Sequence, residues 1–281
     1  MAAPFARILL ATEHSEFDAG AEALAFALAQ RSGLALAAVL PVLSNAEFES
    51  EAPQAAAMAD SQASSRREWL EAAAAAQGLS FDLHTRHGPE PYREIVDEAR
   101  ERAADLIVIR RRGRPGLLAN LLVGDMVSKV LAHAPCNALV VPRAAKMWAH
   151  SVLVAVDPGA PDRAPLALAA AIAAAFALPL QVVVVIDGHG RSQAEQVLQR
   201  ALAEARAVVP QAGGELLEGK PQQQIIAAAA RHAADLVAVG RHGGEGFART
   251  WIGGVAHKVI GLAECAVLVR VIALPAEASS S

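Results

Sequence analysis

The stretch VGRHGGEGFARTWIGG, residues 239–254, carries six glycines directly after the apolar run AADLVAV. Backbone N–H groups hold a phosphate by turning toward one point, which needs unusual backbone angles and leaves no room for a Cβ atom. Gly240 and Gly243 would permit that turn, and Gly253 and Gly254 would bring the start of the next helix to the anion. The loop therefore predicts a phosphate site.

The chain repeats itself, and the glycine-rich loop belongs to the second copy. Three segments of the first half return in the second: RILLATE (7–13) as SVLVAVD (151–157), ERAADLIVIRRRG (101–113) as ARHAADLVAVGRHG (230–243), and GDMVSKVLAHAPCNALVV (124–141) as GGVAHKVIGLAECAVLV (253–269). A repeat of this kind predicts two copies of one domain, which we place at 1–145 and 150–272. About fourteen additional residues of the first copy are expected near NAEFESEAPQAAAMADSQASS.

The elements that must position the loop are those of a parallel sheet. Short apolar runs rich in β-branched residues alternate with alanine-rich stretches, which predicts strands covered by helices on both faces. We expect two tandem Rossmann-like α/β domains, each with its own five-stranded parallel sheet. Ligands of such sheets bind at the carboxyl ends of the strands, where Asp157, Val185 and Gly240 lie. The strands of the second copy are expected at about 151–157, 181–186, 214–217, 235–240 and 265–271.

Three features together resemble the universal stress protein family. The loop reads G-x2-G-x9-G from Gly240 to Gly253, Asp157 closes the first strand of its copy, and 134–141 reads like APC-x-x-L-V-V. The resemblance covers nearly the whole chain, as two tandem domains. It implies an adenine nucleotide alpha hydrolase-like fold and ATP as the ligand, with Mg²⁺ accompanying the phosphates.

The resemblance also assigns the nucleotide contacts. Asp157 and Val185 would meet the adenine and ribose end, and Val239 would line the base pocket. Gly254 and Val255 would meet the phosphates through their backbone. The full predicted set is Asp157, Val185, Val239, Gly240, Arg241, His242, Gly243, Gly253, Gly254 and Val255.

The second copy departs from the ATP-binding members at the end of this pattern. Gly254 stands where those members have Ser or Thr, and Ala256 stands where they often have a polar residue. One lost hydrogen bond typically removes about 0.5–1.5 kcal/mol of net stabilisation. We therefore expect weaker ATP binding than in the best binders of the family.

The first copy departs much further, and we expect it to be degenerate for ATP. Arg110 occupies the first glycine position, Glu13 replaces the aspartate at the strand end, and Asp125 stands where a hydroxyl would touch phosphate. A carboxylate at a helix start suits the helix but repels a phosphate from the same place. The run RRRGR at 110–114 is either a solvated basic loop or a site for a different anion or an acidic partner.

The composition and net charge of the chain argue against nucleic acid and the membrane as partners. A formal net charge of −4 gives no general basic field for nucleic acid. The apolar segment 164–186 is long enough for a bilayer, but Pro179 interrupts it, so we interpret it as a buried helix, a turn and a strand. Cys136 and Cys265 lie far apart, outside any CxxC spacing, and predict buried thiols in a reducing cytoplasm.

Other candidate chemistry is weak. HExxH, GxSxG and the Walker pattern GxxxxGK[ST] do not occur in the sequence, and no nucleophile stands beside a base. His84 and His87 are three apart in an expected strand, so they should point to opposite faces rather than share a metal. We expect neither an enzyme nor a protein-bound metal site.

Two functions remain open at this point. In the first, the second domain binds ATP, and the protein acts as a cytoplasmic stress-response regulator on an unidentified protein partner. In the second, the tandem domains bind no nucleotide and form an interaction scaffold. The last strand of each domain would then pair in an intramolecular pseudo-dimer, and a homodimer is a further option. Slow ATP hydrolysis is a third, weaker alternative.

Overall fold

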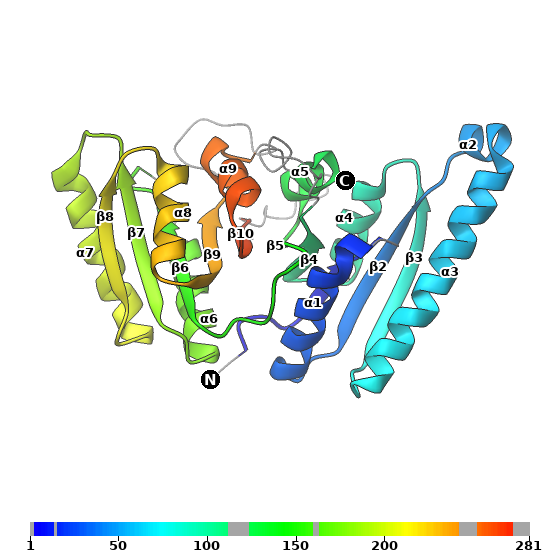
Figure 1. Cartoon of the computed structure of the whole chain (residues 1–281), viewed down its shortest axis with the longest axis horizontal. Helices are drawn as coiled ribbons and strands as arrows, with labels where there is room; N and C mark the ends of the chain where they lie inside the picture. Colours follow the sequence, from blue (N-terminus) through cyan, green and yellow to red (C-terminus); the bar gives the residue numbers. More distant parts are fainter. Residues whose placement is uncertain (1–2, 14–15, 112–123, 160–162, 242–251, 272–281) are drawn as a thin grey trace, which may run out of the picture.

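A single sheet of ten strands runs through the whole protein. The computed structural model describes residues 3–13, 16–111, 124–159, 163–241 and 252–271. Within these ranges the strand order is β3-β2-β1-β4-β5-β10-β9-β6-β7-β8, with the first half on one side of the β5–β10 contact and the second half on the other (Figure 1).

The first half contributes strands β1 to β5, all parallel to one another. Its elements are β1 (Ile8–Ala11), the short 3-10 helix η1 (Glu16–Asp18), α1 (Ala19–Ser32), β2 (Leu36–Leu43), α2 (Ala46–Glu51), α3 (Pro53–Ala76), β3 (Phe81–Gly88), α4 (Pro91–Glu101), β4 (Leu106–Arg110), α5 (Asp125–His133) and β5 (Asn137–Val141). The additional residues of this copy form α2 and the start of the long helix α3, which is where the repeat placed them.

The second half repeats the pattern with strands β6 to β10. Its elements are β6 (Ser151–Val156), α6 (Ala164–Ala175), β7 (Leu180–Ile186), α7 (Arg191–Val208), β8 (Gly213–Glu218), α8 (Pro221–Arg231), β9 (Ala234–Gly240), α9 (Gly254–Leu262) and β10 (Ala266–Arg270). The predicted strands are confirmed, each boundary within one residue. The apolar segment 164–186 is a helix followed by a strand, and no helix in the described part of the chain is long and apolar enough to cross a bilayer.

Two apolar layers hold the helices on the sheet. Side chains alternate between the faces of a strand, so neighbouring residues enter different layers. Leu10 and Val154 belong to the layer under α1, α3, α6 and α7, whereas Leu9 and Leu153 belong to the layer under α4, α5, α8 and α9. Because both faces are covered, the central strands are apolar throughout, as parallel sheets require.

The two five-stranded parallel sheets are joined through the last strand of each half, the pairing that the sequence analysis gave for an intramolecular pseudo-dimer. β5 and β10 pair antiparallel, with Leu139 opposite Leu268 and Val140 opposite Val267, and this ladder joins the two parallel sheets into one. The two strands would otherwise be exposed edges with unpaired backbone groups. Within the described chain, only β3 and β8 remain as edges of the sheet.

Candidate functional site

Three predicted site segments of the second half meet at one edge of the sheet. β6 lies between β7 and β9, and all three run parallel. Val156 is level with Val184 of β7, and Val154 is level with Ala238 of β9. Asp157, Val185 and Gly240 therefore lie at nearly the same height, at the carboxyl ends of their strands. The strand order changes direction at β6, which is the usual position of a ligand crevice in such sheets.

Asp157 is exposed to solvent, whereas Val185 and Val239 are nearly buried. The carboxylate of Asp157 is exposed, and its Oδ1 accepts a hydrogen bond of 2.8 Å from the backbone N–H of Gly159. This bond fixes the turn after β6, as in an Asx turn. Val185 and Val239 are 9 % and 4 % exposed and form an apolar surface beside the carboxylate.

The glycine-rich loop is closed at its base by backbone hydrogen bonds. The N–H of Gly253 donates to the carbonyl oxygen of Arg241 at 2.7 Å, and the N–H of Arg241 donates to the carbonyl oxygen of Arg270 at 3.1 Å. The start of α9 is thereby held beside the end of β9. His242 and Gly243 lie outside the described residues, so their predicted contacts stay predictions.

The first turn of α9 offers backbone donors without a side chain in the way. Gly253 is the N-cap residue and provides no side-chain cap, and the first N–H groups of a helix have no intrahelical partner. A Cβ atom built on Gly254 meets no heavy atom within 4 Å. Packing therefore leaves room at Gly254 for a larger residue or for a ligand atom. Val255 is exposed, whereas Ala256 is buried.

Arg241 differs from the expected picture in the direction of its side chain. Its guanidinium is buried, with the residue 7 % exposed, and its Nη1 donates to the carbonyl oxygen of Ala132 at 3.2 Å. That carbonyl belongs to α5 of the first half. Only the backbone of Arg241 stays at the base of the loop.

An internal ion cluster fills the equivalent position of the first half. Arg110, which corresponds to Gly240, is 4 % exposed and pairs with Glu13 and Asp18. The Nε of Arg110 lies 3.0 Å from Oδ1 of Asp18, a residue with no exposed surface. Asp125 at the start of α5 pairs with Lys129 at 3.1 Å. The strand-end position that β9 leaves to a glycine is thus occupied by protein side chains here.

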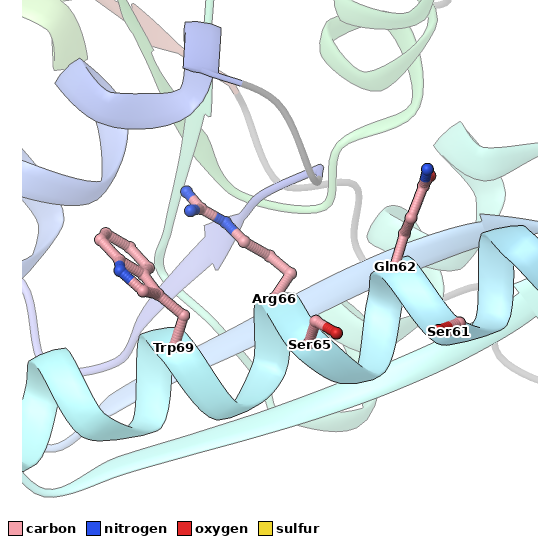
Figure 2. Close-up of a pocket in the computed structure, with 5 residues that line it drawn as sticks. All are labelled: Ser61, Gln62, Ser65, Arg66 and Trp69. Atoms are coloured by element: carbon pink, nitrogen blue, oxygen red, sulfur yellow. The ribbon is translucent and has the colours of Figure 1, made fainter.

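A hollow over α3 is a feature that the sequence analysis did not single out. It has a volume of about 450 Å³ and is lined by Ser61, Gln62, Ser65, Arg66 and Trp69 (Figure 2). The Arg66 guanidinium lies 4.3 Å from the centre of the Trp69 ring and bonds the buried Glu22 at 2.5 Å. These residues fall in and beside the additional segment of the first copy, where the repeat offered no counterpart. The hollow lies in the other half of the protein from the glycine-rich loop.

His84 and His87 each pair with a carboxylate on a helix that covers the sheet. His84 bonds Glu98 of α4, whereas His87 bonds Asp60 of α3, so the expected opposite orientation is confirmed. Among the described residues no group of three or more His, Cys, Asp or Glu side chains could hold a metal.

The two thiols are largely removed from solvent. Cys136 is buried and Cys265 is half-buried, a smaller degree of burial than expected for the latter. Burial raises the thiol pKa to about 12 for Cys136 and about 11 for Cys265. Both thiols therefore stay protonated at neutral pH and are poor nucleophiles.

Comparison with known proteins gives a consistent result. The sequence model of the universal stress protein family matches twice, at residues 4–142 and 149–270. A universal stress protein of Synechocystis is 35 % identical over 85 residues, which cover 29 % of this chain and 54 % of the relative. The chain therefore spans about half the length of that curated relative.

Solved structures show the same tandem fold. A universal stress protein from Archaeoglobus fulgidus superposes with a TM-score of 0.71 at 18 % identity, covering 95 % of this chain and 96 % of the other. A putative universal stress protein from Pseudomonas aeruginosa gives a TM-score of 0.68 at 20 % identity, with coverages of 96 % and 95 %. At these identities the likeness concerns the fold.

Proposed function

This chain belongs to the universal stress protein family, and on that premise we propose that its second half binds ATP and that the first half does not. The observation that carries the proposal is the closed base of the glycine-rich loop. The bond from the Gly253 N–H to the Arg241 carbonyl sets the N-terminus of α9 beside the carboxyl ends of β9 and β6. A helix N-terminus with free amides at a sheet crevice suits a phosphate.

The neighbouring residues fit the rest of a nucleotide. Asp157 is exposed, and its carboxylate suits a ribose hydroxyl or a base amino group. Val185 and Val239 are nearly buried, so adenine would meet only the small apolar surface that they leave exposed at the strand ends. The open space at Gly254 leaves room for a phosphate oxygen.

The proposed role is regulation rather than turnover. Mg²⁺ would arrive with the phosphates, since Mg²⁺ is commonly held by substrate phosphates, waters and one or two carboxylates. The side chains placed at this edge, Asp157, Val185 and Val239, supply a carboxylate and apolar contact. We propose a cytoplasmic protein whose ATP-bound form is recognised by a protein partner.

Calorimetric titration of Mg-ATP into the full-length protein tests the proposal. We expect one ATP per chain, binding lost in Gly243→Val, and binding retained in Gly113→Val. Gly113 is the matched control because it occupies the corresponding loop position of the first half. Binding that survives Gly243→Val would place the nucleotide elsewhere.

A scaffold without nucleotide is the second candidate. It is favoured by the ion cluster at Arg110, which occupies the position of the first half that corresponds to Gly240. It is also favoured by Gly254, which lacks the hydroxyl of ATP-binding members. Folded protein that gives no heat with ATP, ADP or AMP would support this candidate over the first.

A further inference from the structure

Two arginines cross between the halves of the protein. Arg111 directly follows β4, and its Nη1 donates to the carbonyl oxygen of Ile260 at 3.1 Å, to that of Gly261 at 3.5 Å and to that of Ala263. These three carbonyls lie at the C-terminal end of α9. A residue of the first half thus holds the last helix of the second half.

Arg241 makes the same contact in the opposite direction. It is the repeat counterpart of Arg111, 130 positions later. Its Nη1 donates to the carbonyl oxygens of Leu131 at 3.5 Å and Ala132 at 3.2 Å, in the last turn of α5. We call the two contacts the crossed arginines.

Helix carbonyls replace carboxylates as partners of both guanidinium groups. Among the described residues neither arginine forms an ion pair, and burial lowers the pKa of each. The last carbonyls of a helix have no intrahelical partner and carry the negative end of the helix dipole. The crossed arginines satisfy these carbonyls and place positive charge where the dipole favours it.

The two contacts hold the elements that precede and follow the glycine-rich loop. The loop starts after Arg241, whose side chain is fastened to α5 of the first half. It ends at α9, whose C-terminal end is fastened to Arg111. A nine-residue helix is about 13 Å long and rigid, so holding its C-terminal end also restrains the position of its N-terminus.

We propose that Arg111 of the first half is a positioning residue for the phosphate site of the second half. The inference rests on the proposed function, because it concerns how tightly the phosphates of ATP are held. It also gives the first half a role in nucleotide binding that needs no ligand of its own.

The test compares Arg111→Met with the parent in the full-length protein, using Mg-ATP and adenosine as probes. Arg111 contacts the C-terminal end of α9 and would act only through the position of that helix, whose N-terminus is proposed to meet the phosphates. Arg111→Met should therefore weaken Mg-ATP binding by about tenfold and change adenosine binding by less than about twofold. Arg111→Lys retains a charge that reaches fewer carbonyls, and should recover part of the loss.

Hydrogen exchange gives a second readout that needs no nucleotide. Arg111→Met should raise amide exchange in α9 and leave α5 unchanged, whereas Arg241→Met should raise exchange in α5. This crossed pattern uses each variant as the control for the other. A purely local effect of either arginine would instead raise exchange beside the mutated residue.

The outcomes separate the two proposals. A parent protein that binds no ATP refutes the proposed function and the positioning role together, and the exchange pattern then shows whether the crossed contacts still hold the helices. A parent that binds ATP, with Arg111→Met binding equally well, refutes the positioning role alone. Equal losses of ATP and adenosine with exchange raised along the whole chain would also refute it, because they indicate general loosening.

Discussion

Replacing Arg110 by Met should destabilise the protein far more than replacing an exposed arginine. Arg110→Met removes the guanidinium that pairs with the carboxylates of Asp18 and Glu13. The Asp18 side chain is 1 % exposed, so water cannot replace the lost partner, whereas the Glu13 side chain is 29 % exposed and can be hydrated. Removing one partner of a buried ion pair typically costs about 3–5 kcal/mol of unfolding free energy. We expect the lower end, about 3 kcal/mol, because only one carboxylate is fully buried.

Urea-induced unfolding followed by circular dichroism measures this loss, and Arg67→Met is the matched control. Arg67 pairs with Glu71 one helical turn away at 2.8 Å, with both side chains about half exposed. Exposed pairs of this kind contribute little to stability, so the control should unfold close to the parent. Adding Asp18→Asn to Arg110→Met should restore part of the stability, because it removes a buried charge that has lost its contact with Arg110.

The reasoning about the ion cluster would be refuted by equal unfolding free energies for Arg110→Met and Arg67→Met. A double variant less stable than Arg110→Met would also count against it, since the buried Asp18 carboxylate would then not be the source of the cost. Either result would mean that Arg110 is not what holds the two carboxylates in the closed site of the first half.

Three further predictions concern binding, pH and thiol reactivity. Gly254→Ser should tighten Mg-ATP binding in titration by roughly two- to tenfold, because it adds one donor in open space, whereas Asp125→Ser in the first half should not. Burial raises the pKa of Glu98, but hydrogen bonds from two arginines outweigh burial and lower it below 4.5. The charged carboxylate therefore stabilises the fold above pH 4.5, and this stabilisation is lost as the pH falls through the pKa of the folded protein. Glu98→Gln should therefore lower the Tm at pH 7 and have less effect near pH 3. Cys136 and Cys265 should react with a thiol reagent at pH 8 only after unfolding, in a colorimetric assay.

Each of these three predictions can be contradicted by one result. Unchanged ATP affinity in Gly254→Ser would show that phosphate does not come near residue 254. An effect of Glu98→Gln that is equally large at pH 7 and pH 3 would show that its charge is not what stabilises the protein. Rapid modification of native thiols would mean that Cys136 or Cys265 is reached by solvent in the folded state.

The alternation of strands and helices along the chain, and the strand bounds of the second half, could be predicted from the sequence because most strands there are short apolar runs between helical stretches. The repeat then supplied the domain organisation without any structural information. The pairing of the last strand of each half was expected for an intramolecular pseudo-dimer, but the apolar pattern of the strands does not itself dictate it. The ladder between β5 and β10 depends on contacts between residues more than a hundred positions apart, and the apolar pattern of a buried strand is the same whichever strand lies beside it.

The sequence predicted the backbone positions of the candidate site better than the directions of its side chains. Glycine spacing located the base of the loop correctly at Gly240 and Gly253. The family resemblance gave Arg241 as a nucleotide contact, but its guanidinium bonds the carbonyl oxygen of Ala132 in α5. The charged residues Arg110 and Glu13 were recognised as departures from the pattern, yet only the fold shows that they and Asp18 form one cluster.

Because the two halves are covalently linked, the ladder between β5 and β10 does not depend on the concentration of the protein. Two separate chains joined by such a ladder would come apart on dilution, whereas tethered partners meet at an effective concentration set by the linker and not by expression level. Identical partners would also have to carry identical sites. In this protein the two sides of the ladder differ in sequence, with Arg110 ending β4 where Gly240 ends β9. Because both halves belong to one chain, every molecule carries the two arrangements in a one-to-one ratio.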